Sequence, residues 1–316
     1  RPLFRTAQQP VTRHRQRRTP GRNELHRGLT QMQLWDKPGP MLLRVSVVLV
    51  LAYAVSGEVM QRAVTATLLP ISGQLHSPLD ARVDYDSGTQ LLADATARLL
   101  PEAVAQAERQ QGATLKPGFK IRIFGSPERY SRHGACPPGS RACTFRGSLA
   151  LAPGISDKRE FLLPLITHEL SHVLMQQRMG MLKAGRIPPW FAEGLAVSVS
   201  GGGGAENVSP EEARRAILAG LSFTPDVESS LFAQKTAHSF GLEHRMFYRQ
   251  SALFVDYLRQ QNPAAFQTLL SYMHAGGSFE QAFTQSYPGG MAPLWSGFKV
   301  ELQRSAAQDA AAAANR

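Results

Sequence analysis

The sequence predicts an α+β protein, in which a small mixed sheet packs on one long helix and the C-terminal half is mostly helical. Short strands are expected only before residue 158, whereas the chain after that point has helical periodicity almost throughout. The composition, with 43% apolar and 19% charged residues over 316 positions, is typical of a globular protein with enough chain for a core. Two cysteines are too few for a disulfide-built scaffold.

Before residue 158 the pattern predicts one helix and two strands. Residues 91–110 contain good helix formers with apolar residues at helical spacing. Residues 120–124 alternate in polarity and end at a glycine, and residues 148–152 are closed by a Pro-Gly pair, so both segments are expected to be strands. The segment 126–147 is expected to be mainly loop, and residues 55–88 a mixture of short strands and loops.

After residue 158 the predicted elements are helices. A helix over 159–179 ends near Gly180, and a second helix over 190–200 begins directly after two prolines, which suit a first helical turn. Ser209-Pro-Glu-Glu212 opens another helix, because Ser caps it and the acids complement the helix dipole. Further helical periodicity covers residues 245–261, 263–274 and 278–303, and an Ala-rich tail at 306–316 is expected to fray.

The first forty residues carry most of the net charge of +11. They hold nine Lys and Arg against two acidic residues, whereas residues 55–316 are nearly balanced. A basic arm of this kind could bind nucleic acid or anionic lipid. That function conflicts with the export signal that follows, so no nucleic-acid partner is expected. Residues 1–40 are interpreted as an upstream extension that is disordered or precedes the true start.

Residues 41–54 have the three parts of a secretory signal peptide. Met41-Leu-Leu-Arg44 gives a positive start, a short apolar run follows, and Ala52-Tyr-Ala54 gives the small residues that signal peptidase recognises. The apolar run is shorter than the roughly 20 residues that a membrane-spanning helix needs. We therefore expect an exported protein, periplasmic or secreted, that contacts a membrane only transiently through this segment. An uncleaved membrane anchor is the alternative.

Export makes the two cysteines interpretable. Cys136 and Cys143 enclose a loop rich in Pro and Gly. In an oxidising compartment a disulfide between them would pin this loop, although two free thiols remain an alternative. No further cysteine is present to build a Cys-rich zinc site.

His168-Glu-Leu-Ser-His172 lies inside the helix predicted over 159–179 and matches the pattern H-E-x-x-H. Residues four apart lie on one side of a helix, about 6 Å apart along its axis, so two imidazoles can converge on one metal ion. Glu169 lies beside them, within reach of a metal-bound water. The predicted core face holds Leu163, Ile166, Leu170, Val173 and Leu174, and the predicted cleft face holds Leu165, His168, Glu169, His172 and Gln176.

Glu193 is the candidate for a third ligand. A catalytic zinc ion takes three protein ligands and one open position, and Glu193 stands 21 residues after His172, on the next predicted helix. Alone, Glu193 would be an acid in a first helical turn that the helix dipole stabilises. Because Glu193 follows H-E-x-x-H at this spacing, we favour its interpretation as a metal ligand.

We expect an α+β part over 55–158 and a part with the catalytic helices over 159–305.

His168-Glu-Leu-Ser-His172 followed by Trp190-Phe-Ala-Glu-Gly-Leu-Ala196 resembles the gluzincin metallopeptidases of the peptidase MA-like clan. The longer segment 188–204 is similar to exported bacterial members of that clan. Weaker similarity continues over residues 247–257 and 277–283, so the resemblance spans roughly residues 160–300 and is most specific at its start.

The resemblance implies a zincin-like fold, Zn²⁺ as the cofactor and a peptide or protein as the substrate. His168, His172 and Glu193 are then the zinc ligands, and Glu169 is the catalytic acid/base that takes a proton from water and delivers it to the leaving amine. Gluzincins supply an oxyanion donor from further along the chain. Tyr248 is the first candidate here, with His244 and His238 as alternatives. By the same similarity, the residues of an edge strand that would pair with extended substrate are Leu149, Ala150 and Leu151.

Two functions from different classes remain open. The leading hypothesis is an exported zinc-dependent peptidase; the alternative is a non-catalytic binding module of the cell envelope that keeps the zinc fold. Retention of all three H-E-x-x-H residues favours catalysis. No glycine-rich phosphate loop supports a nucleotide enzyme. Gly201–Gly204 is equally consistent with a mobile rim and a passive linker, and the oligomeric state is open.

Overall fold

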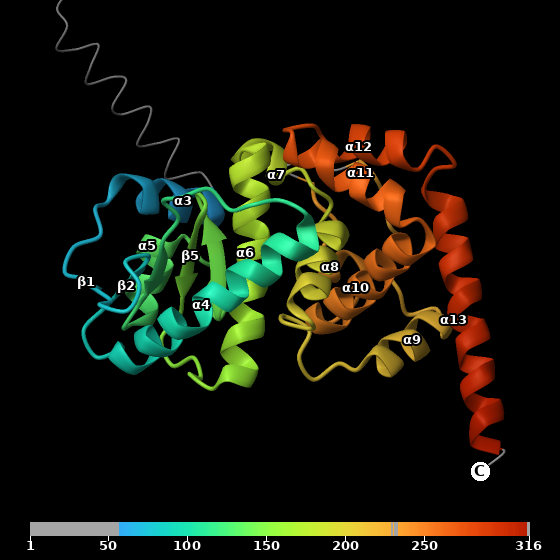
Figure 1. Cartoon of the computed structure of the whole chain (residues 1–316), viewed down its shortest axis with the longest axis horizontal. Coiled ribbons are helices and arrows are strands. Elements are labelled where there is room, and N and C mark those ends of the chain that lie inside the picture. The colour runs from blue at the N-terminus through green and yellow to red at the C-terminus, as the bar shows by residue number, and fades with distance from the viewer. Residues whose placement is uncertain (1–56, 229, 231–232, 315–316) are drawn as a thin grey trace, which may run out of the picture. The chain divides into compact units, whose positions relative to one another are not determined.

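The computed structural model describes residues 57–228, 230 and 233–314. Within that part of the chain, the residues from 58 onward form one compact unit. Figure 1 shows a sheet with helices packed around it, followed by a purely helical part, so the predicted α+β class is confirmed. The predicted extension 1–40 and signal segment 41–54 lie outside the described residues, and the division near residue 158 stays a prediction. None of the described helices has the length and apolar character needed to cross a bilayer.

The sheet has five described strands in the order β1-β2-β3-β5-β4. The central pairs β2–β3 and β3–β5 are parallel, and the outer pairs β1–β2 and β5–β4 are antiparallel. The strands predicted over 120–124 and 148–152 are confirmed as β3 and β5. The strand bounds are β1 Leu75–His76, β2 Val83–Tyr85, β3 Ile121–Ile123, β4 Ala142–Phe145 and β5 Ser148–Leu151.

The prediction of an edge strand at Leu149, Ala150 and Leu151 is wrong. These residues belong to β5, whose backbone is paired with β3 on one side and β4 on the other. The reason is a two-residue hairpin at Arg146 and Gly147, both with positive φ, which folds the preceding segment back as an additional strand. The edge strand on this side is therefore β4, inside a segment that was expected to be loop.

Alternating side chains of the sheet serve two cores. Leu149 and Leu151 join the large core with two helices, α4 (Gln90–Gln111) and α6 (Arg159–Met179). Ala150, between them, joins a smaller cluster with Phe124 and Tyr130 on the opposite face. That face is covered by α5 (Pro127–Gly134), with α3 (Glu58–Leu68) packed against it. The helices predicted over 91–110 and 159–179 are thus confirmed, and the second of them, α6, supports the β5–β4 side of the sheet.

The C-terminal half is built around α8, which packs between α6 and α10. Trp190 anchors the start of α8, because its ring contacts four aromatic rings of the core and its Nε1 donates a hydrogen bond to the carbonyl of Asp226 (2.8 Å). The described elements of this half are α7 Met181–Ala184, α8 Pro189–Ser200, α9 Pro210–Leu218, the 3₁₀ helix η1 Ala237–Phe240, α10 His244–Gln261, α11 Pro263–His274, α12 Phe279–Ser286 and α13 Met291–Ala314.

Several predicted boundaries differ from the structure. The helical stretch expected over 278–303 is two helices, α12 and α13, because Pro288 and two glycines break it. The tail expected to fray is helical to Ala314, since alanine is the best helix former and Arg214 of α9 pairs with Asp309 of this helix (2.7 Å). The helices α3 and α5 were missed, although Ser126-Pro-Glu128 gives α5 the same start signal as Ser209-Pro-Glu211 gives α9.

Candidate metal site

A cavity of about 880 Å³ is lined by residues of the edge strand β4 and of the helices α6, α8 and α10. All five residues predicted to form the cleft face of α6 line this cavity: Leu165, His168, Glu169, His172 and Gln176. On the predicted core face, Ile166, Leu170, Val173 and Leu174 are fully buried and Leu163 is half-buried. The predicted orientation of the helix is therefore confirmed.

The structure brings the three predicted ligands together inside the cavity. The Nε2 atoms of His168 and His172 are 3.2 Å apart, and Oε2 of Glu193 lies 3.3 Å from the first and 3.5 Å from the second. Ligand bonds of about 2.0–2.2 Å in tetrahedral geometry put neighbouring donor atoms about 3.3–3.6 Å apart. Two imidazole nitrogens and one carboxylate oxygen thus form a group that could hold a metal ion.

The hydrogen bonds around His168 fix which of its nitrogens faces this group. Its Nδ1 lies 2.8 Å from the carbonyl oxygen of Gly203, and because a carbonyl only accepts, Nδ1 carries the proton. The bare lone pair of Nε2 then points at the Nε2 of His172. Oε2 of Glu193 is buried, and its polar neighbours are the two histidine nitrogens at 3.3 and 3.5 Å. Lone pairs this close need a cation between them, so the donor set fits a divalent metal ion.

The charges in the cavity balance one another. Burial alone would lower the pKa of His172, but the carboxylates of Glu193 and Glu169 outweigh it and raise this pKa to about 9. Burial likewise acts against an ionised Glu193, yet His172 and His168 hold the pKa of Glu193 well below its usual range. Without metal, His172 therefore carries a second proton, and its positive charge offsets the charge of Glu193. A metal ion that binds here has to displace this proton.

Helix α8, which carries Glu193, packs closely against α10. A Cβ on Gly194 would lie 2.6 Å from the carbonyl oxygen of Ser251, so only glycine permits this approach. The approach also brings Tyr248 of α10 to the site, where its ring stacks on His168 with centroids 6.1 Å apart. The sequence Glu193-Gly194 thus places a ligand and its neighbouring helix together.

Glu169 and Tyr248 both line the cavity as predicted. The negative charge of Glu193, followed by burial, raises the pKa of Tyr248 above its ordinary range, so its hydroxyl stays protonated and able to donate. Of the two alternatives, His244 also lines the cavity, with its ring 6.4 Å from that of Tyr248. His238 lies on η1 and is not among the lining residues.

Sequence reasoning missed two contacts that support the site. The carbonyl of Gly203 orients His168, so Gly201–Gly204 is more than a passive linker; its position directly after the helix of Glu193 was the available signal. Thr144 of β4 donates a hydrogen bond to Glu169. No sequence signal marked Thr144, because the strand that presents it was not predicted.

Replacing Gly204 with alanine is expected to weaken the binding of a metal ion to this group about 10- to 100-fold, the usual cost of disturbing the residues that orient a metal ligand. The new Cβ would lie 2.8 Å from Cε1 of His168, and the residue has a φ of +86°. Gly201→Ala is the matched control, since its φ is +70° but its Cβ would meet nothing within 4 Å. Competition with a chromogenic chelator measures both affinities, and equal weakening in the two variants would rule out the contact with His168 as the cause.

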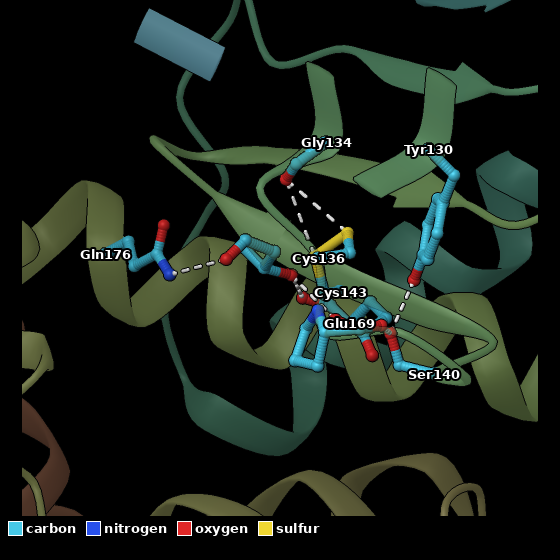
Figure 2. Close-up of a disulfide and its surroundings, with 9 residues drawn as sticks. Tyr130, Gly134, Cys136, Ser140, Cys143, Glu169 and Gln176 are labelled. Carbon is cyan, nitrogen blue, oxygen red and sulfur yellow. Dashed lines mark hydrogen bonds between the residues drawn. A yellow bond between two sulfur atoms is a disulfide. The ribbon is translucent and has the colours of Figure 1, made fainter. Parts of the chain in front are cut away.

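The wall of the cavity includes a loop closed by a disulfide. Cys136 and Cys143 are bonded, with Cα atoms 5.7 Å apart, which confirms the predicted bridge and excludes free thiols at these positions. Figure 2 shows the bridge beside Glu169 of α6, with the hydroxyls of Tyr130 and Ser140 hydrogen-bonded (2.9 Å) across the loop. The residues Pro137 to Thr144 all line the cavity, so the bridge restrains one wall of the site.

Removal of this bridge in a Cys136→Ala/Cys143→Ala variant is expected to reduce the free energy of unfolding by about 2–3 kcal/mol, the chain-entropy value for so short a loop. Urea titration of the oxidised protein, the reduced protein and the variant measures the effect. The reduced protein and the variant should have the same free energy of unfolding. A variant as stable as the oxidised protein would show that the fold alone holds the loop.

No known protein-family model matches the chain, and no curated protein is significantly similar to it. The likeness to gluzincins therefore rests on the two short motifs at residues 168–172 and 190–196 and on the arrangement of His168, His172 and Glu193 in a cavity. The structure directly shows an α+β fold and a His/His/Glu group that could hold a metal ion.

Proposed function

We propose that this protein is an exported zinc-dependent peptidase. One observation carries the proposal: two imidazole nitrogens and a carboxylate oxygen converge in a cavity that Glu169 also lines. Two nitrogen donors and one oxygen donor suit Zn²⁺ and leave a coordination position open for catalysis. A structural zinc site would be closed by a fourth protein ligand, and within the described residues the cluster has three.

The proposed roles of the side chains follow from their places in the cavity. His168, His172 and Glu193 would hold the ion, with His168 oriented by Gly203. A bound Zn²⁺ ion supplies Lewis acidity that activates water and polarises a scissile carbonyl. Glu169 would accept the proton of the attacking water and transfer it to the leaving amine. Tyr248, which stays protonated, would donate a hydrogen bond to the oxyanion that develops.

The edge strand β4 supports an extended peptide as the substrate. Its residues Ala142, Cys143 and Thr144 line the cavity, and the strand is paired on one side only, with β5. A peptide could therefore add to its free edge by main-chain hydrogen bonds and cross the site beside Glu169. This proposal transfers the substrate-binding role from Leu149, Ala150 and Leu151 of β5 to the strand that precedes them.

An oxidising compartment is consistent with the disulfide between Cys136 and Cys143. Such bridges persist in exported proteins and are rare where glutathione keeps thiols reduced. Together with the signal segment predicted at 41–54, the bridge supports export to the periplasm or beyond as part of the proposal.

Cleavage of a diverse peptide mixture by the purified protein tests the proposed function. The protein is freed of metal with a chelator, divided, and one half is reloaded with one equivalent of zinc. Mass spectrometry should find new peptide ends only with the reloaded half. If the zinc-loaded protein leaves every peptide intact, the peptidase proposal fails and the alternative of a non-catalytic binding module gains support.

A further inference from the structure

The edge strand β4 contributes one polar side chain that contacts the proposed catalytic carboxylate. The hydroxyl of Thr144 lies 2.8 Å from Oε2 of Glu169 and 3.2 Å from the main-chain oxygen of the same residue. Thr144 also lines the cavity. Its hydroxyl is therefore part of the wall of the site and in contact with the one group that the mechanism requires to move a proton.

The direction of this hydrogen bond follows from chemistry. A carboxylate without a proton only accepts, so the hydroxyl of Thr144 is the donor. Its single proton favours the charged carboxylate over the main-chain carbonyl, because hydrogen bonds to ionised groups are about twice as strong as neutral ones. The bond engages Oε2 and leaves Oε1 of Glu169 for proton transfer. It also restricts rotation of the side chain of Glu169, a residue that is only 7% exposed.

The strand that carries Thr144 is itself held on the helix that carries Glu169. Thr144 pairs with Leu149 in the register of β4 and β5. Gln176, two turns after Glu169 on α6, accepts a hydrogen bond from the amide of Gly147 (2.9 Å) and donates one to the carbonyl of Thr144 (3.5 Å). The neighbouring Cys143 is fixed by its disulfide, and Figure 2 shows Gln176, Glu169 and the disulfide along the same stretch of α6. The position of the hydroxyl is thus set by the fold.

We propose that Thr144 is a positioning residue, which holds the carboxylate of Glu169 in the orientation needed for proton transfer. This inference rests on the proposed peptidase function and goes beyond it, because nothing in the metal-binding pattern assigns a role to Thr144. Thr144 acts through Glu169, and it needs no contact of its own with the reacting atoms.

A purely structural role for the hydroxyl makes different predictions. If the bond only fastened β4 to α6, its loss would lower stability and weaken substrate binding along the strand. If it orients Glu169, its loss lowers kcat and leaves KM nearly unchanged, since substrate and zinc are held by other groups. Thr144→Val removes the hydroxyl but keeps a β-branched side chain of the same shape, which suits a strand. Thr144→Ser restores the hydroxyl on a smaller side chain.

The test measures kcat and KM of the wild type, Thr144→Val, Thr144→Ser and Glu169→Gln on one peptide that the wild type cleaves. For Thr144→Val we expect kcat to fall about 10- to 100-fold, the effect of a misplaced catalytic group, with KM and zinc content near wild type. Thr144→Ser should recover most of kcat. A crystal structure of metal-free Thr144→Val should show the carboxylate of Glu169 displaced from β4.

Two results would overturn the inference. One is a Thr144→Val variant with wild-type kcat while Glu169→Gln is inactive. The other is a Thr144→Val crystal structure in which the carboxylate of Glu169 keeps its place. If no form of the protein, wild type included, cleaves any peptide, the proposed function fails, and the crystal structure still decides whether Thr144 orients Glu169.

Discussion

Replacement of Glu169 by glutamine is expected to reduce kcat/KM for peptide hydrolysis about 100- to 10,000-fold, the usual contribution of a general acid/base. Glutamine has the same shape as glutamate and keeps an oxygen that can accept the hydrogen bond of Thr144. It cannot take the proton of an attacking water. Zinc should stay bound, because Glu169 is not one of the three converging ligands. Steady-state kinetics and the zinc content of the same sample measure the two effects together.

Glu160→Gln is the matched control for this prediction. Glu160 lies in the first turn of the same helix, α6, and is exposed to solvent. Its replacement should leave kcat/KM unchanged. Equal activity of Glu169→Gln and the wild type would show that another group moves the proton, or that the observed cleavage comes from a contaminant.

Replacement of His172 by alanine is expected to weaken zinc binding by more than about 100-fold, beyond the usual effect of disturbing a residue that only orients a ligand. Two donors remain, and the carboxylate of Glu193 loses the partner that most strongly favours its ionised form. The stabilisation of the wild type by zinc, about 4 kcal/mol at a thousand times its dissociation constant, should fall to about 1.4 kcal/mol or less in the variant at the same zinc concentration. Thermal unfolding with and without zinc measures this loss.

His244→Ala is the control, since His244 lines the same cavity but is not in the ligand group. It should bind zinc with the same affinity as the wild type.

The pH dependence of zinc binding gives a second check on His172. Because this residue holds a proton below a pKa of about 9, zinc must displace it, and the affinity of the wild type should fall as the pH falls. An unchanged affinity in His172→Ala would place the metal elsewhere.

The helices that carry the site could be predicted because local signals agree with their packing. Helix α6 begins and ends where the sequence indicated, since its apolar residues follow one face and Gly180 ends it. Helix α8 begins at a proline that suits a first turn, and its core contacts agree with that start. At these positions the helical period, the caps and the core all favour one conformation.

The edge strand β4 could not be predicted from the sequence, and the role of Thr144 could therefore not be predicted either. Residues 142–145 are all half-buried and show no clear alternation. Their pairing depends on a hairpin turn at Arg146 and Gly147, in which arginine takes a positive φ that it rarely adopts. The three ligands could be inferred from spacing, but the contacts that orient them come from residues such as Gly203, whose place after the helix of Glu193 does not reveal that its carbonyl reaches His168.

We infer that His168, His172 and Glu193 together bind one zinc ion. Diffraction from zinc-loaded crystals, recorded on both sides of the zinc absorption edge, tests it most directly. We expect one strong anomalous peak in the cavity, at bonding distance from the Nε2 atoms of both histidines and from the carboxylate of Glu193. A zinc-loaded crystal with no peak between these three residues, or with its peak at another site, would show that they do not form the zinc site.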